Sequence, residues 1–199
     1  MKQLIVSIGR EFGSGGHEIG EHLAKRYGLP LYDHNLLDEV AVFHNMDRNT
    51  LQEYDEMKRN KLLYRSVKGM NSSPADNVAE MQFSFIRDKA ESGQSFVIVG
   101  RCSETVLKEF EGLISVFVIG DMKDKVTRVQ RLYGKSEKEA EKLIREKDRK
   151  RKKYHDSHCE AKWSDPHSYD LCINSSKLGT EGSVDFLAEY IDRCVKAAK

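Results

Sequence analysis

The sequence predicts a single α/β domain in which a parallel sheet is covered by helices on both faces. Short β-branched or apolar runs that end at Gly, Pro or Asp recur along the chain, as they do in buried parallel strands. Segments with apolar residues at helical spacing separate these runs, and this alternation is typical of an α/β sheet. The length of 199 residues is enough for one full hydrophobic core.

The elements follow in order. Five strands are expected at residues 3–8, 29–32, 95–99, 114–119 and 170–174. One amphipathic helix follows the first strand and another ends the chain. Two charged stretches interrupt the alternation. Residues 45–73 predict a peripheral helical insertion, whereas residues 134–163 open with a capping box, Ser136 to Glu139, that should begin a helix leaving the core.

Composition restricts the function classes. Thirty-three Lys and Arg balance 32 Asp and Glu, so nothing in the net charge of +1 favours a nucleic-acid or membrane partner. No apolar stretch approaches the roughly 20 residues that cross a bilayer. We therefore expect a soluble, cytoplasmic protein in which any anion-binding site is local. The four cysteines include no Cys-x-x-Cys pair, which favours reduced thiols.

A glycine-rich loop follows the first strand. Residues 9–17 contain four glycines and lead into a helix that should begin near Glu18. Glycines let backbone N–H groups turn toward a ligand, and a helix N-terminus favours an anion. The pattern predicts phosphate binding; a tight turn without a ligand is the alternative. The expected nucleotide-binding residues of this loop are Gly13, Ser14, Gly15, Gly16 and His17.

The loop departs from a regular Walker A motif. Gly16 and His17 follow Gly15, where that motif has its lysine and its magnesium-binding hydroxyl. Arg10 is the nearest cation that could take over part of the role of the lysine, as a planar fork instead of a point charge. An ordinary surface arginine is the alternative interpretation.

Motifs along nearly the whole chain resemble the cytidylate kinase-like family, the uncharacterised branch beside true cytidylate kinases. They are Gly9-Arg10-Glu11-Phe12-Gly13-Ser14-Gly15-Gly16, Pro30-Leu31-Tyr32-Asp33, Val97-Ile98-Val99-Gly100-Arg101-Cys102, Asp148-Arg149-Lys150-Arg151-Lys152-Lys153-Tyr154 and Tyr169-Asp170-Leu171. The resemblance implies a P-loop kinase fold of three αβα layers around a five-stranded parallel sheet. It implies one domain over 1–199, with a core (1–35, 80–133, 164–199), a nucleoside-monophosphate-binding insertion (36–79) and a lid (134–163), and ATP with Mg²⁺ as cofactors.

The resemblance also indicates which residues could bind the molecule that accepts the phosphoryl group. True cytidylate kinases have Gly-Arg-Asp after the third core strand, where this chain has Gly100-Arg101-Cys102. Arg101 could contact an acceptor, or pair with a carboxylate. Asp33 could position an acceptor sugar or a hydrated Mg²⁺, or cap a helix. Gln82 is a weaker acceptor-side candidate. Cys102 reads as a small buried residue, since its surroundings in the sequence offer no adjacent histidine.

The lid-like segment carries eight basic residues between positions 142 and 153. Mobile arginines suit phosphoryl transfer, which depends on positioning and on neutralising charge. A solvated basic face is the alternative. The expected lid residues are Arg145, Arg149 and Arg151, with Asp148 orienting an arginine or a magnesium-bound water, and Arg128 and Arg131 contacting the nucleotide from the preceding helix.

Histidines and cysteines near the end of this segment suggest a metal, but their spacing fits no regular finger, so we predict no metal site. The residues concerned are His155, His158, Cys159, His167 and Cys172. Two functions remain open. One is transfer of the ATP γ-phosphoryl group to a nucleoside monophosphate or a similar small phosphorylated acceptor. The other is a non-catalytic nucleotide sensor or scaffold that has lost the lysine. RNA binding is disfavoured by the neutral net charge.

Overall fold

The computed structural model describes residues 3–33, 36–43, 47, 49, 52 and 74–197. Five strands form one sheet in the order β2-β3-β1-β4-β5, and every neighbouring pair is parallel. The predicted fold class is therefore confirmed. The strands are β1 (Ile5–Arg10), β2 (Leu31–Tyr32), β3 (Phe96–Val99), β4 (Leu113–Ile119) and β5 (Leu171–Asn174).

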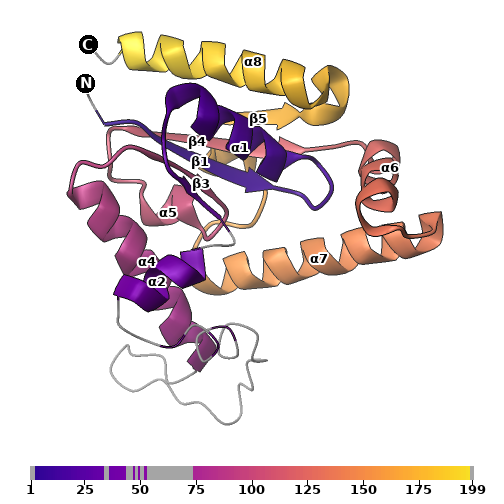
Figure 1. Ribbon diagram of the computed structural model, residues 1–199, viewed down its shortest axis with the longest axis horizontal. Coiled ribbons are helices and arrows are strands. Elements are labelled where there is room, and N and C mark those ends of the chain that lie inside the picture. The colour runs from indigo at the N-terminus through magenta and orange to yellow at the C-terminus, as the bar shows by residue number, and fades with distance from the viewer. Residues whose placement is uncertain are drawn as a thin grey trace.

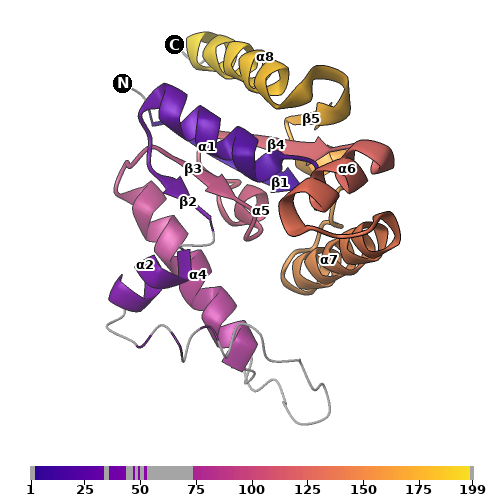
Figure 2. The same ribbon diagram turned by 45° about the vertical axis from the view of Figure 1, so that its right-hand side comes forward.

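Helices cover both faces of the sheet (Figures 1 and 2). On one face, α1 (Gly16–Tyr27) and α8 (Ser175–Ala197) bury a core of aliphatic side chains that includes Ile19 and Leu187. On the other face, α2 (Leu36–Phe43), α4 (Pro74–Glu91) and α5 (Ser103–Val106) enclose a second, more aromatic core. Burial on both faces explains why the strand sequences are continuously apolar instead of alternating.

The register brings the ends of the central strands together. In β1, Ile8 lies opposite Val99 of β3 and Val116 of β4. Because all strands are parallel, the loops that follow them emerge at one edge of the sheet. This edge is where open α/β sheets bind ligands.

Two helices, α6 (Met122–Tyr133) and α7 (Glu137–His158), form a hairpin beside this edge. The predicted capping box begins α7: the Ser136 amide and hydroxyl both donate to Glu139 Oε2, at 2.9 and 2.7 Å. Buried Val126, Val129 and Ile144 join the two helices. A short 3-10 turn, Pro166–Ser168, leads from α7 to β5.

The charged stretch 45–73 falls almost entirely outside the described residues, so the predicted helical insertion there stays a prediction. The division into core, insertion and lid also stays a prediction. None of the helices in the described part of the chain has the length and apolar character of a membrane span.

Candidate functional site

The glycine loop turns sharply between β1 and α1. Gly13 and Gly15 have φ values of 84° and 81°, in the left-handed region that glycine adopts without steric cost. Gly15 caps α1, and the first bond of the helix runs from the Ile19 amide to the Gly15 carbonyl at 2.9 Å. The amides of the first turn, including those of Gly16 and His17, therefore have no partner inside the helix and can serve an anion.

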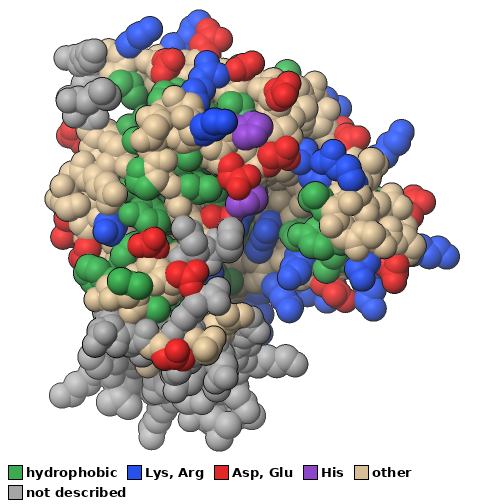
Figure 3. Space-filling view, in the orientation of Figure 1, with side chains coloured by type: hydrophobic (Ala, Val, Ile, Leu, Met, Phe, Trp, Pro, Cys, Tyr) green, Lys and Arg blue, Asp and Glu red, His purple; other side chains and the backbone are tan. Residues whose placement is uncertain are grey.

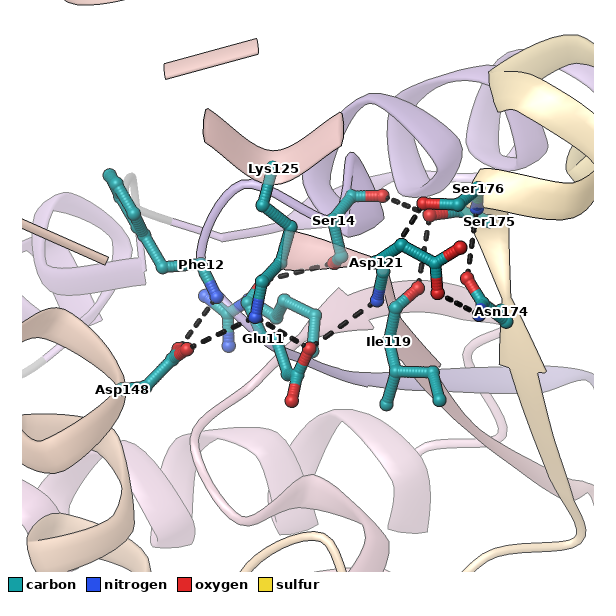
Figure 4. A network of polar contacts seen from close by, with 12 residues as sticks. Glu11, Phe12, Ser14, Ile119, Asp121, Lys125, Asp148, Asn174, Ser175 and Ser176 are labelled. Atoms are coloured by element: carbon teal, nitrogen blue, oxygen red, sulfur yellow. Dashed lines mark hydrogen bonds and ion pairs between the residues drawn. The ribbon is translucent and has the colours of Figure 1, made fainter. Parts of the chain in front are cut away.

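A buried ion pair fixes the start of the loop (Figure 4). Lys125, from α6, is 4% exposed and places Nζ 2.8 Å from Glu11 Oε2 and 3.7 Å from Asp148 Oδ2. The same Glu11 oxygen accepts a hydrogen bond from the Gly120 amide at 3.3 Å. One carboxylate thus joins the loop to the end of β4 and to α6.

The other side of the loop is tied to the start of α8 (Figure 4). The Ser175 hydroxyl lies 2.6 Å from the Ser14 carbonyl and 3.0 Å from the Ile119 carbonyl. Asp121 accepts a 2.8 Å hydrogen bond from the Asn174 side chain. That bond and Lys177 lower the pKa of Asp121. These contacts hold the loop against the ends of β4 and β5.

Arg10 and Gly16 are sterically coupled. A Cβ added to Gly16 would lie 2.6 Å from Arg10 Cβ, closer than side chains pack, so the Arg10 side chain occupies the space that a side chain at position 16 would need. Its guanidinium lies against Gly100 and within 3.9 Å of Asp33 Oδ1. Burial and the nearby Arg151 lower the pKa of Arg10 to about 9.

Helix α7 contacts the loop through one face. The Phe12 amide donates to Asp148 Oδ1 at 2.6 Å, and Arg151 donates to the Arg10 carbonyl at 3.1 Å while its guanidinium lies 5.4 Å from the centre of the Phe12 ring. Burial raises the pKa of Asp148 and lowers the pKa of Arg151. Two cations, Arg10 and Arg151, are therefore held close together at the end of β1.

A pocket of about 350 Å³ lies between the loop, α6 and the start of α8. Arg128 forms an ion pair with Glu18 and donates to Thr180 Oγ1 at 2.8 Å, and its guanidinium lies against Gly15. Among the predicted nucleotide-binding residues, the pocket lining includes Gly13, Ser14, Arg128 and Arg131, together with Ser175 and Gly179, which sequence reasoning did not select.

The predicted acceptor residue Asp33 lies beside Arg10, and its Oδ2 contacts His17 Nδ1 at 2.5 Å. After β3, Gly100, Arg101 and Cys102 have φ values of 80°, 61° and 55°. Such values are costly for residues with a Cβ and occur where a site demands them. Gln82 is fully buried, and neither polar atom of its amide has a hydrogen-bond partner among the described residues.

Comparison with known proteins identifies the family to which this chain belongs. The sequence matches the cytidylate kinase-like family over residues 5–177. The chain belongs to this family. Among curated proteins no match is found.

Solved structures agree with this assignment. An uncharacterized protein from Eubacterium ventriosum is 39% identical, with a TM-score of 0.76 over 96% of this chain and 99% of that chain. A shikimate kinase from Bacteroides thetaiotaomicron is 14% identical (TM-score 0.57; 95% and 98% covered), and a gluconokinase from Sinorhizobium meliloti is 13% identical (TM-score 0.58; 100% and 98% covered). The last two show that this cytidylate kinase-like protein has a P-loop kinase fold.

The cytidylate kinase-like chain does not bring all its predicted lid arginines to the loop. Arg145 and Arg149 are exposed and line a separate surface pocket on α7, together with Lys138 and Lys142. Figure 3 shows Lys and Arg side chains gathered around the hollow between the core and the α6–α7 hairpin. Of the three arginines, Arg151 is the one that contacts the loop.

Sequence reasoning missed Glu11 and Lys125. The signal for Lys125 was its position three residues before Arg128, which places both on one face of α6.

The expectation that Cys102 has no histidine beside it is wrong. The fold brings His155 and Cys159, from the last turns of α7, within 4.8 Å of it. The hydrogen bond between the two thiols raises the pKa of Cys102 and lowers the pKa of Cys159. Burial opposes the charged form of His155, but Cys159 and Glu104 raise its pKa to about 10. The other three residues that were considered as ligands from the sequence, His158, His167 and Cys172, do not belong to this group.

Proposed function

We propose that this protein is a phosphotransferase that binds ATP on the loop 13–17 and transfers the γ-phosphoryl group to a nucleoside monophosphate or a similar small phosphorylated acceptor. The membership of the family and the P-loop kinase fold support phosphotransfer in general. The observation that carries the proposal is the packing of the Arg10 side chain against Gly16, which holds a partly buried arginine at the glycine loop in a chain without the P-loop lysine.

Electrostatics supports a polyanion at this position. Arg10 is 21% exposed and lies near both Arg151 and Arg101, with Asp33 as its ion-pair partner. Burying like charges together costs free energy, and a phosphate placed between them would offset that cost. A guanidinium also binds phosphate oxygens through two parallel hydrogen bonds, which an ammonium group cannot do.

We place the donor nucleotide in the pocket between the loop, α6 and α8. Arg128 and Arg131 would contact the phosphates or the base from α6, and the amides of Gly13, Ser14, Gly15, Gly16 and His17 would contact the phosphates. ATP would bring Mg²⁺ with it. Mg²⁺ keeps several waters when phosphates bind it, and Asp33 is suited to hold such a hydrated ion because its carboxylate lies at the loop.

The acceptor would lie on the side of Asp33, Gln82 and Arg101. The unpaired buried amide of Gln82 supports this placement, because buried polar groups usually have hydrogen-bond partners. Arg101 would bind the phosphate of the acceptor. We further propose that residues 36–79 complete this side and that residues 134–163 act as the lid, in line with the family resemblance.

Transfer would then depend on charge neutralisation by arginines. Arg151 already contacts the loop, and Asp148 orients it by pairing with the same segment. Arg145 and Arg149 could reach the phosphates only if the lid rearranges, so Arg151 is the primary candidate. Phosphoryl transfer requires little covalent chemistry from the protein, and no general base is needed.

The test is a coupled ADP-release screen over all ribo- and deoxyribonucleoside monophosphates, run beside calorimetric titrations of ATP and GTP. We expect ATP binding and ADP release with at least one acceptor. Nucleotide binding without ADP release for any acceptor would favour the sensor or scaffold instead, and the missing lysine at position 16 is the feature that favours that alternative. Absence of nucleotide binding would contradict both functions.

A further inference from the structure

Three potential metal ligands meet where the end of α7 packs against the turn after β3. The ligand atoms of Cys102, His155 and Cys159 all lie within 4.8 Å of one another. Cys102 and His155 are buried, each about 4% exposed, and Cys159 is half-buried. No other group of this kind occurs in the part of the chain that the structure describes. His155 lies in the last turn of α7 and Cys159 is the residue that caps it, with its amide donating to the His155 carbonyl at 2.9 Å.

A carboxylate orients the imidazole of His155, as is common for histidines that bind a metal. Its Nε2 lies 2.8 Å from Glu104 Oε1, and the Glu104 side chain is 2% exposed. Thr105 Oγ1 donates to the same carboxylate oxygen at 3.0 Å. Metal-ligating histidines commonly donate one ring N–H to a carboxylate in this way, which leaves the lone pair of the other nitrogen for the metal.

The other nitrogen of this ring lacks a hydrogen bond. His155 Nδ1 is buried and has no hydrogen-bond partner among the described residues. A carboxylate oxygen of Asp156, Oδ1, is 3.7 Å away from it and accepts a hydrogen bond from the Trp163 amide. A buried nitrogen that lacks a partner is uncommon in a folded protein, because its desolvation is not compensated. A cation at Nδ1 would supply that compensation.

We propose that Cys102 Sγ, Cys159 Sγ and His155 Nδ1 bind one thiophilic divalent cation, with Zn²⁺ as the expected ion. Thiolate and imidazole ligands select such ions over Mg²⁺ or Ca²⁺, which prefer oxygen. Zn²⁺ lies about 2.3 Å from sulfur and about 2.0 Å from nitrogen, so ligand atoms within 4.8 Å of each other need to close by about 1 Å. The three residues leave the fourth position to water.

The cation would link the acceptor side to the lid helix. Cys102 follows Arg101 directly and has a left-handed φ of 55°, and His155 lies one helical turn beyond Arg151. A metal bridge would therefore fix the end of α7 relative to the turn after β3. It would also compensate the unfavourable backbone of that turn. This site does not depend on the proposed kinase activity, and its test uses metal binding alone.

Cobalt binding tests the proposal. The full-length protein is freed of metal with a chelator under reducing conditions and titrated with Co²⁺, which replaces Zn²⁺ and absorbs visible light. We expect one Co²⁺ per chain, the visible bands of a tetrahedral site, and a thiolate-to-cobalt charge-transfer band. Zn²⁺ should then displace Co²⁺ and raise the melting temperature by roughly 5–10 °C at a concentration about 100 times its Kd.

Matched variants assign the ligands. Cys102→Ser and Cys159→Ser should each reduce the charge-transfer band, because one of the two thiolates is lost, or weaken Co²⁺ binding at least 100-fold. Cys172→Ser, at an exposed cysteine outside the group, should bind as the wild type does. Glu104→Gln should weaken binding by about 10-fold or more while the three ligands remain, because the carboxylate only orients the imidazole. Circular dichroism establishes that each variant is folded.

Three outcomes would overturn the proposal. The first is a reduced wild-type protein that shows no thiolate-to-cobalt band. The second is a folded Cys102→Ser or Cys159→Ser variant that binds Co²⁺ as tightly as the wild type. The third is a metal-free protein in which mass spectrometry finds Cys102 and Cys159 joined as a disulfide that persists in reductant, because the thiols would then have each other as partners instead of a metal.

Discussion

The two faces of α7 differ in charge and in surroundings. One face carries Asp148, Arg151 and His155, which contact the glycine loop and the turn after β3. The other face carries Arg145 and Arg149, which are exposed around a surface pocket. A rotation of about 100° per residue separates groups that are neighbours in the sequence. A basic run therefore indicates a function only for the residues that face the site.

Burial distinguishes the two faces chemically as well. On the face that contacts the glycine loop, here called the inner face, burial raises the pKa of Asp148 and lowers the pKa of Arg151. Perturbed groups gather at functional sites, because such sites exclude water and concentrate charge. Arg145 instead has a local partner, since it pairs with Glu141, one turn earlier on the same helix, at 3.9 Å. Exposed pairs of this kind contribute little to stability.

The largest expected effect is the loss of stability when a buried side chain on the inner face of α7 is shortened. Ile144 is fully buried between α6 and α7. Ile144→Ala should lower the free energy of unfolding by about 3 kcal/mol, because it removes buried methyl groups and leaves a cavity. Lys142→Ala, on the exposed side of the same turn, should change it by less than about 0.5 kcal/mol. Urea unfolding curves measure both. Equal effects would mean that α7 does not pack as described.

Substitutions of arginines on the two faces of α7 should lower kcat by different amounts. Arg151→Met should lower kcat about 100-fold, because it removes a guanidinium next to the transferred phosphoryl group. Arg149→Met should lower kcat by less than about 10-fold. Arg193→Met, at an exposed site on α8, is the matched control and should leave kcat unchanged. Single-turnover assays with the acceptor found by the ADP-release screen supply the rates. A larger loss for Arg149→Met would show that the lid turns its other face to the substrate.

Breaking the contacts between α7 and the glycine loop should have an intermediate effect on stability. Asp148→Ala removes the acceptor of the Phe12 amide and one partner of Lys125, and should cost about 2 kcal/mol of stability. Glu146→Ala, an exposed acidic residue of the same helix, should cost less than about 0.5 kcal/mol. Thermal melts at matched pH give the comparison. A small effect at Asp148 would contradict its structural role at the loop.

The smallest expected effect is the change in stability and in ATP affinity when Arg10 loses its proton at high pH. Its pKa falls to about 9 in the folded chain, well below the ordinary value of an arginine. Above about pH 9 the side chain is therefore still protonated in the unfolded chain but largely neutral in the folded chain. Because the unfolded chain then binds more protons, the free energy of unfolding increases as pH rises through about 9. ATP affinity should change in the opposite direction, by a few fold between about pH 8 and pH 10, because the neutral side chain binds phosphate less well. Burial is the largest cause of this lowered pKa, and the charged or titratable neighbours that shift it further are Arg151, Asp33, Arg101 and Tyr169.

Arg10→Met supplies the comparison for this titration. The variant should lose the pH dependence of both stability and ATP affinity in this range. It should also be at least as stable as the wild type near pH 7, because it replaces a buried charge by an apolar chain. A pH dependence that persists in Arg10→Met would assign the titration to another group.

Local patterns allowed much of the fold to be predicted. The glycine loop and the capping box of Ser136 each lie within a few residues, so their geometry follows from local rules. The apolar runs likewise identified all five strands, although β2 has only two residues, Leu31 and Tyr32. Buried strands need continuous apolar sequence, and that requirement is visible without a structure.

Contacts between distant segments could not be predicted from the residues alone. Glu11 and Lys125 are 114 positions apart, and only the packing of α6 against the loop brings them together. The same holds for Cys102 with His155, because the sequence gives no register between the turn after β3 and the end of α7. The rotation of α7, which separates Arg151 from Arg149, also depends on tertiary packing.

A calorimetric comparison of ATP with adenosine tests most directly whether the loop and Arg10 together bind a polyphosphate. We expect the wild type to bind ATP at least about 100-fold more tightly than adenosine, and Arg10→Met to reduce this ratio about 10-fold with little change for adenosine. Equal affinities for ATP and adenosine in the wild type, or an unchanged ratio in the variant, would contradict the account.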